Sequence, residues 1–473
     1  MTNSENPSVY ASGSSTKLSF GEKVGYSLGD AASNLYFGIF MSFLPIFYTD
    51  VFGLPAAAMG TMLMITRLWD AVNDPIMGTI TDRTETRWGK FRPYIIGWAP
   101  ILAVGGILAF TTPDFEIGGK IFYAYISYTI LTMLYTAVNV PYSALMGVMT
   151  PNSMERASAS QFRFVAAFCG QLVVSGATLF LVGYFGGGNV QAGWRMTVGL
   201  FGIISTVLLG ITFFTTKERV RPPKEQKADM KQDLKDLFRN KPWVLIAIAT
   251  VFQLLFAVLF GSATPYYFKY YVLGQHLTIF GHTIALSIDG FTSAFLTVGK
   301  LATLLGAILA LYFARVFDKK NTYAGFLAAA AIFTCAFYFM KPDNVLLILG
   351  FNVIASFCMG TVSVMQWAIY TDTVDYGEWK FGRRATGLIM AASLFALKLG
   401  LTFGGTFLGW ILGYHGFEAN AEQTESALFG IRMLMSFYPA VFGIIGGLVM
   451  IFYPLKNSVM SKIEEDLEAR RKE

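Results

Sequence analysis

Twelve apolar runs dominate the sequence, and each is about long enough to cross a lipid bilayer. They lie at about 25–48, 56–80, 93–111, 118–148, 159–184, 194–215, 243–272, 287–316, 322–340, 344–371, 386–413 and 427–454. A transmembrane helix needs about 20 apolar residues, so twelve of them would use about half of the 473 residues, in line with a hydrophobic fraction of 54%. We therefore predict an all-α integral membrane protein. This excludes a string of soluble domains and an outer-membrane barrel, whose strands alternate apolar and polar residues.

The most polar interior stretch divides the runs into six and six. It carries nine Lys or Arg residues and two adjacent prolines between positions 217 and 241. We predict an N-terminal six-helix bundle at 24–216, a cytoplasmic linker at 217–242 and a C-terminal six-helix bundle at 243–455. Residues 1–23 are expected to be a disordered cytoplasmic lead, and 456–473 a cytoplasmic tail. An Asp with several cations follows both the second and the eighth run, which indicates repeated halves of the kind found in alternating-access transporters.

The distribution of Lys and Arg indicates how the chain is oriented in the membrane. Lys and Arg concentrate in alternate connections, which predicts that both termini and the linker are cytoplasmic, and this explains the net charge of +6 without nucleic acid. The three cysteines lie inside apolar runs and the three histidines in polar connections. We therefore expect no disulfide framework, no zinc site and no cofactor. We also expect no enzyme activity, because there is no soluble catalytic domain and no nucleophile–base motif.

The second run contains charges that are costly inside a bilayer, so function is the first interpretation of them. Asp70 and Asp74 are four residues apart, which places them on one helix face. Two carboxylates this close repel each other unless one is protonated or a cation lies between them. Asn73 adds a neutral oxygen, and Pro75 removes a backbone hydrogen bond. Such oxygen ligands suit a hard cation such as Na⁺; the alternative is that Asp70 pairs with Arg67.

Other charged side chains interrupt the apolar runs elsewhere. Asp30 lies in the first run, Arg163 starts the fifth and Lys398 lies in the eleventh. Such groups can share the hydroxyls of a sugar through charge-assisted hydrogen bonds. A structural ion pair between Asp30 and Lys398 is the alternative interpretation. The role of a further cation, Lys300, is left open.

Polar and aromatic residues follow one face of the fourth run. Thr136, Asn139 and Tyr142 recur at three-residue spacing and therefore form one stripe. The tenth run ends with Gln366 and Trp367. Tyr135 and Trp367 are candidates for stacking against a sugar, with ordinary packing as the alternative.

Six motifs follow one another along the chain: GYSLGD, RLWDAVNDPIMG, RWGKFRP, YTAVNVPY, TDTVDYGEW and LKLG. Together they resemble the glycoside–pentoside–hexuronide:cation symporters, a branch of the major facilitator superfamily that includes the melibiose permease. The resemblance covers nearly the whole chain. It implies twelve transmembrane helices in two pseudo-symmetric bundles, located in the bacterial inner membrane, with a small sugar and a coupling cation, Na⁺ or H⁺, as partners.

The resemblance also implies roles for individual residues. The cation site would be formed by Asp70, Asn73, Asp74 and Thr136. The sugar site would be formed by Asp30, Tyr135, Asn139, Tyr142, Arg163, Gln366, Trp367 and Lys398. The inward gate would be closed by ion pairs among Asp82, Arg83, Arg87, Glu155, Arg156, Asp375, Glu378 and Arg384.

The chain departs from the melibiose permease at the sugar site. Asn139 stands where that permease has a second sugar-binding carboxylate, and Ser143 stands where it has a tryptophan. The expected cargo is therefore a xyloside, another glycoside or a glucuronide. The remaining alternatives are a proton-coupled glucuronide carrier, a Na⁺-coupled lysolipid transporter on the same scaffold and a non-transporting sensor.

Overall fold

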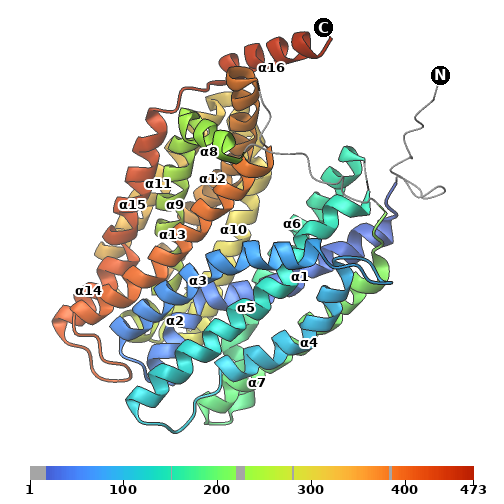
Figure 1. Cartoon of the computed structure of the whole chain (residues 1–473). Helices are drawn as coiled ribbons and strands as arrows, with labels where there is room; N and C mark the ends of the chain where they lie inside the picture. Colours follow the sequence, from blue (N-terminus) through green and yellow to red (C-terminus); the bar gives the residue numbers. More distant parts are fainter. Residues whose placement is uncertain (1–16, 151, 220–229, 280–281, 383–385, 473) are drawn as a thin grey trace, which may run out of the picture. The chain divides into compact units, whose positions relative to one another are not determined.

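The structure is a computed structural model that describes residues 17–150, 152–219, 230–279, 282–382 and 386–472. Over these described residues it is mainly helical, with one two-stranded antiparallel sheet (Figure 1). The helices and strands are α1 (Phe20–Ser42), α2 (Leu44–Ile46), η1 (Phe47–Val51), α3 (Ala56–Asp82), α4 (Arg92–Ala109), α5 (Ile117–Met149), α6 (Ser153–Gly186), α7 (Val190–Thr215), α8 (Met230–Arg239), α9 (Lys241–Tyr267), η2 (Phe268–Val272), β1 (Gln275–Ile279), β2 (His282–Leu286), α10 (Ile288–Phe317), α11 (Lys319–Cys335), η3 (Ala336–Phe339), α12 (Val345–Phe381), α13 (Thr386–Tyr414), α14 (Glu425–Met435), α15 (Phe437–Ile451) and α16 (Asn457–Lys472).

Most of the expected spans are present as long apolar helices. Within the described residues, ten helical segments are long and apolar enough to cross a membrane, and an eleventh is the bent pair of α1 with α2 and η1. The bend of 60° falls just before Pro45, at the first turn of α2. The remaining expected span is α3, which is 27 residues long but is interrupted by Arg67, Asp70 and Asp74.

The chain forms two compact units. Unit 1 contains residues up to Phe40 and Trp69–Gln226, whereas unit 2 contains Met41–Leu68 and the chain from Lys227 onward. The segment 41–68, expected in the N-terminal bundle, therefore belongs to unit 2. The reason is close packing: the Ser262 hydroxyl donates to the Met41 carbonyl at 2.8 Å, and Gly60 lies against Gly409 on α13. The boundaries of the two bundles stay predictions.

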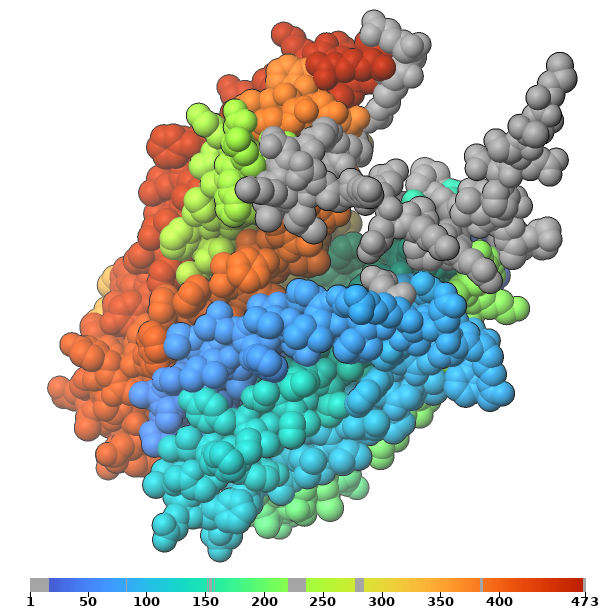
Figure 2. All heavy atoms as spheres, in the orientation of Figure 1, coloured from blue at the N-terminus to red at the C-terminus, as the bar shows by residue number. Residues whose placement is uncertain are grey.

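In unit 1, α4 packs against α5 and α7, and α6 packs against α7. Many large apolar side chains of these helices are exposed, among them Ile101, Phe122, Phe180 and Ile203. Figure 2 shows one face of the molecule, coloured by sequence position. The first residues of the predicted linker are fixed to this unit. The Glu218 carboxylate accepts hydrogen bonds from the Lys90, Phe91 and Arg92 amides at the start of α4, which is where a negative charge stabilises a helix. Arg219 forms a two-pronged ion pair with Glu22 at 2.6 and 3.0 Å.

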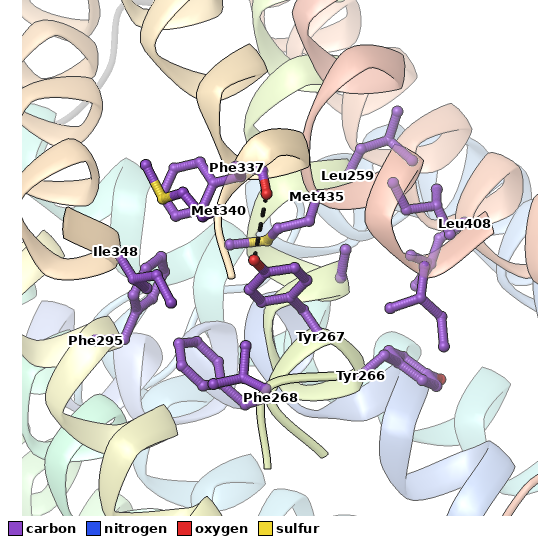
Figure 3. Packing of buried hydrophobic residues seen from close by; sticks show 14 of the residues in the cluster. Leu259, Tyr266, Tyr267, Phe268, Phe295, Phe337, Met340, Ile348, Leu408 and Met435 are labelled. Atoms are coloured by element: carbon purple, nitrogen blue, oxygen red, sulfur yellow. Dashed lines mark hydrogen bonds between the residues drawn. The ribbon is translucent and has the colours of Figure 1, made fainter. Parts of the chain in front are cut away.

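In unit 2, α9 packs against α13 and α15, while α12 packs against α10 and α11. An apolar core surrounds the end of α9 and η2, and Figure 3 shows Tyr267 donating a hydrogen bond to the Phe337 carbonyl inside it. The expected tail forms α16, whose apolar face is buried. The Trp379 indole donates to Asp466 at 2.9 Å, which fixes α16 to the end of α12.

Glycine allows α10 and α12 to approach closely. A Cβ built on Gly306 would lie 1.9 Å from the Phe357 carbonyl oxygen, and one on Gly360 would lie 1.9 Å from the Thr303 carbonyl oxygen. These clashes are with backbone atoms, so a rotamer change cannot relieve them. The two helices would have to move apart.

We therefore expect Gly306→Val to destabilise unit 2 by about 1–3 kcal/mol, the usual cost of overpacking. The measurement is thermal unfolding of the purified protein in detergent. Gly325→Ala on α11 is the matched control, because a Cβ there would meet no atom within 4 Å. Equal melting temperatures for both variants would contradict the close contact.

An ion pair joins the start of α1 to the start of α6. Lys23 Nζ lies 2.8 Å from Glu155 Oε2, and the Leu18 amide donates to the same oxygen at 3.2 Å. These hydrogen bonds lower the pKa of Glu155. A glutamate in an unfolded chain titrates at about 4.3. The pair therefore stabilises the fold above that pH, and its contribution disappears as the pH falls through the lowered pKa of the folded state.

Lys23→Met should lower the melting temperature at pH 7, and the difference from the unchanged protein should shrink as the pH falls below about 4. Thermal unfolding across a pH series measures this. Lys456→Met, at an exposed position before α16, serves as the control for simple loss of a positive charge. A difference that persists undiminished in acid would contradict the role of the Glu155 carboxylate.

Candidate functional site

Helix α3 has two chemically distinct faces. Trp69, Val72 and Ile76 are 45–53% exposed and form an apolar stripe at helical spacing. Asp70, Asn73 and Asp74 lie away from this stripe, and the Asn73 side chain is buried. The helix continues through Pro75 without a break. The carboxylates therefore face protein, while the exposed stripe is suited to lipid.

A single hydroxyl of α5 contacts both carboxylates of α3. Thr136 Oγ1 lies 2.8 Å from Asp70 Oδ1 and 3.0 Å from Asp74 Oδ1, and the Thr136 side chain is buried. A hydroxyl has one proton and can donate to only one of these oxygens at a time. The structure thus brings three of the predicted cation-site residues together at atomic contact. Arg67 donates a hydrogen bond to the Leu401 carbonyl on α13 at 3.1 Å.

A second polar cluster of unit 1 is centred on Asp30. Arg163 binds it as a fork, with Nε donating to Oδ2 and Nη2 donating to Oδ1 at 3.2 Å. Tyr142 donates its hydroxyl proton to Oδ2 at 2.7 Å. The guanidinium of Arg163 also lies 5.2 Å from the centre of the Tyr142 ring, within the range of a cation–π contact. Three predicted sugar-site residues, Asp30, Tyr142 and Arg163, therefore contact one another. The ion-pair partner of Asp30 is Arg163.

The GYSLGD motif builds this cluster. Tyr26 stacks on Tyr142 with ring centres 4.8 Å apart and donates its hydroxyl proton to the Tyr142 carbonyl, while the Tyr142 hydroxyl oxygen lies 2.8 Å from the Tyr26 carbonyl oxygen. A Cβ on Gly29 would lie 2.2 Å from the Tyr142 ring, so only glycine allows this approach. Tyr26 was not among the predicted site residues. Its place one turn before Asp30 was the signal that could have found it.

Asn139 is held by two hydrogen bonds. Its Oδ1 accepts from the Ser33 hydroxyl at 2.5 Å, and its Nδ2 donates to the Tyr135 carbonyl at 2.9 Å. Farther along α1, Asn34 Oδ1 accepts from Gln171 at 2.8 Å. Ser33, Asn34 and Gln171 were also missed by sequence reasoning. Their helical spacing from Asp30 and Arg163 was the available signal.

The predicted sugar-site residues of unit 2 lie on α12 and α13. Gln366 is only 2% exposed and donates to the Tyr370 hydroxyl at 3.4 Å, so its side chain lies in the core of the unit. Trp367 is 39% exposed, and its ring meets that of Tyr370 edge to face. Lys398 is partly buried on α13. The structure brings Asp30, Tyr142 and Arg163 together within unit 1, and the complete sugar site stays a prediction.

The predicted gate residues occupy several separate positions. Arg87 lies 4.7 Å from the Trp88 ring centre, and Arg156 donates to the Thr150 carbonyl. Arg83 is exposed, whereas Asp375 and Glu378 lie in the last turns of α12. The side chain of Asp82 and all of Arg384 lie outside the described residues. An unpredicted pair joins Lys319 to Asp372 at 2.8 and 2.9 Å.

Comparisons with known proteins identify the family of the chain. The model of the family described as MFS/sugar transport protein matches residues 25–457. The inner membrane symporter YicJ of Escherichia coli is 36% identical over 95% of this chain and 95% of its own. The isoprimeverose transporter of Lactiplantibacillus pentosus is 34% identical over 95% of this chain and 91% of its own.

Solved structures show the same fold. The inward-facing, unoccupied structure of a bacterial homologue of the human lysosomal transporter Spinster superposes with a TM-score of 0.66 and covers 94% of this chain and 97% of its own. At 15% identity this likeness concerns the fold alone. The predicted major facilitator fold is therefore confirmed. The chain belongs to the MFS/sugar transport protein family, within the glycoside–pentoside–hexuronide:cation symporters that its motifs resemble.

Proposed function

We propose that this protein is a symporter that couples a cation gradient to the import of a glycoside, pentoside or small oligosaccharide by alternating access. The observation that carries the proposal is the Thr136 hydroxyl bound to both Asp70 and Asp74. The names of its relatives, a symporter and an isoprimeverose transporter, support the class of cargo. The proposed location is the bacterial inner membrane with both termini in the cytoplasm.

The proposed cation site consists of Asp70, Asn73, Asp74 and Thr136. Two carboxylates in a low-dielectric site attract either Na⁺, which prefers oxygen ligands, or a shared proton. Binding relieves their repulsion and holds α3 against α5. An empty site leaves the carboxylates to repel each other across the Thr136 hydroxyl. The cation therefore stabilises the packing of these two helices.

Helix α5 connects the cation site to the sugar site. Thr136 binds the α3 carboxylates, and Tyr142, less than two turns later on the same helix, binds Asp30. A cation that fixes α5 against α3 also fixes the Tyr142 hydroxyl and Asn139 for the sugar. Because linkage is reciprocal, the sugar must increase cation affinity by the same factor.

The proposed sugar site combines hydrogen bonding with stacking. Asp30 and Arg163 present an acceptor and a fork of donors that suit vicinal sugar hydroxyls. Tyr135, Asn139, Tyr142, Gln366, Trp367 and Lys398 complete the proposed set. Alternating access then requires an inward gate, for which we propose the cytoplasmic charges Asp82, Arg83, Arg87, Glu155, Arg156, Asp375, Glu378 and Arg384.

Thr136→Val removes the shared hydroxyl while keeping the shape of the side chain. We expect cation-stimulated sugar uptake into proteoliposomes to fall at least tenfold, about 1.4 kcal/mol, at a limiting cation concentration. Uptake by the Asp74→Asn variant should fall further, because this substitution removes the negative charge of a proposed cation ligand. The assay uses xylosides, galactosides, glucosides and glucuronides under separate Na⁺ and pH gradients, which also assigns the coupling ion.

The matched control is Thr132→Val, one turn earlier on α5, where the hydroxyl donates to the Thr129 carbonyl of its own helix. Normal cation-stimulated uptake by Asp74→Asn would overturn the cation site. Absence of uptake of every sugar under both gradients would overturn the sugar symporter itself.

Arg163→Lys keeps the charge but loses the fork that binds both oxygens of Asp30, so this exchange is not conservative. We expect sugar affinity, measured by calorimetry on the purified protein, to fall at least tenfold, with a smaller effect on cation affinity measured in the absence of sugar. Arg195→Lys, at an exposed position on α7, is the control. Unchanged sugar affinity would remove Arg163 from the sugar site.

A further inference from the structure

Two π-helical turns occupy corresponding positions in the two halves of the sequence. η1 follows α1 and α2 at the end of the first span, and η2 follows α9 at the end of the seventh. Each turn closes with a bond across five residues, from the Phe52 amide to the Phe47 carbonyl and from the Leu273 amide to the Phe268 carbonyl. Such turns are rare and concentrate at functional sites. Both belong to unit 2.

The two turns are joined through Asp50 of η1. Its Oδ2 accepts hydrogen bonds from Lys269 Nζ and from the Tyr270 hydroxyl of η2, both at 2.5 Å. Its Oδ1 accepts from the Thr49 hydroxyl at 2.7 Å, and Thr49 in turn lies 2.8 Å from the Tyr266 hydroxyl. The Asp50 side chain is only 2% exposed. A carboxylate buried this deeply depends on its cation partner.

Asn420, in the loop before α14, forms hydrogen bonds with both η1 and η2. Asn420 Nδ2 donates to the Asp50 carbonyl at 2.6 Å, and its Oδ1 accepts from Lys269 Nζ at 2.6 Å. The Asn420 amide donates to the Tyr270 hydroxyl oxygen at 2.8 Å. Asn420 adopts a positive φ of 58°, which Asn tolerates better than most side chains. We call Asp50, Lys269, Tyr270 and Asn420 the Asp50 latch.

Chain connectivity places this latch where a moving transporter must open. Residues 41–68 pack within unit 2, but they are continuous with the parts of α1 and α3 that belong to unit 1. Rocking of the two halves must therefore either bend these helices or separate η1 from η2. The helices packed against η2 are α10 and α14 of its own half, and Figure 3 shows Phe268 close to Phe295 of α10; the same apolar cluster also includes Ile46 and Ala56. The polar contacts between the turns are the ones that can exchange for water.

We propose that the Asp50 latch is the outer gate of the transport path, closed in this structure and opened when Asp50 leaves Lys269. The gate lies at the ends of α1 and α9 opposite to the linker, and its location outside the cytoplasm rests on the proposed topology. Opening hydrates the Asp50 carboxylate and releases Asn420 from η1. The latch is separate from the predicted inward gate, which involves different residues.

The test uses Ser262→Cys as a reporter, in full-length protein whose three native cysteines are replaced by serine. Ser262 is 1% exposed and donates to the Met41 carbonyl, so it lies at the contact that the gate closes. A membrane-impermeant maleimide is added from outside to oriented vesicles. Lys269→Met should increase the labelling rate at least tenfold, because it leaves the Asp50 charge uncompensated and favours the open state.

Two further variants separate gating from general damage. Asp50→Asn combined with Lys269→Met leaves no buried charge, so it should label more slowly than Lys269→Met alone. Asp343→Asn, an exposed carboxylate in the loop before α12, should label like the parent. Equal labelling rates in the parent and in Lys269→Met would overturn the outer gate, and so would faster labelling in the double variant than in the single one.

The labelling assay needs neither the sugar nor the coupling ion. A failure of the proposed symporter would therefore appear as absent uptake with the labelling pattern intact, whereas a failure of the latch would appear as unchanged labelling with normal uptake. A melting curve for each variant identifies unfolding, which would expose the introduced thiol from both sides of the membrane. Labelling of Lys269→Met from both sides would overturn the gate.

Discussion

Compensation of buried charge is the constraint on which the rest of this structure depends. A carboxylate inside a bilayer-spanning helix is costly unless another group satisfies it. Asp30 is satisfied by Arg163 and Tyr142, Asp50 by Lys269 and Tyr270, and Asp70 and Asp74 each contact the Thr136 hydroxyl. In every case the partner comes from a different helix. The helices of this protein are therefore held in specific registers by charge as well as by apolar packing.

The three carboxylate sites differ in the chemistry of the contact that defines each of them. Asp30 and Asp50 each contact a cationic side chain, whereas the contact that Asp70 and Asp74 share is a neutral hydroxyl. A hydroxyl has one proton, so it cannot donate to both carboxylates at once. A cation between the two carboxylates would attract both of them together, and this is why we propose that the coupling ion binds there.

Much of this organisation could be predicted from the sequence, because hydropathy and helical spacing are local. The spacing of Asp70 and Asp74 identified their common face, and the apolar runs identified the spans. Partners were harder to predict. Arg163 is 133 residues from Asp30, so only the fold could choose it over Lys398. Gln366 and Trp367 were both predicted at the sugar site, yet neighbouring residues on a helix point about 100° apart, and Gln366 faces the core.

The first span shows why such a protein needs irregular helices. Asp30 of α1 binds Arg163 within unit 1, whereas Asp50 of η1 binds Lys269 within unit 2. The bend before Pro45 and the π-helical turn of η1 change the direction of the chain between these two carboxylates. The matching turn in η2 presents Lys269 and Tyr270 together to a single carboxylate. One span therefore carries the Asp30 cluster in its regular helix and, by our proposal, a gate in its irregular end.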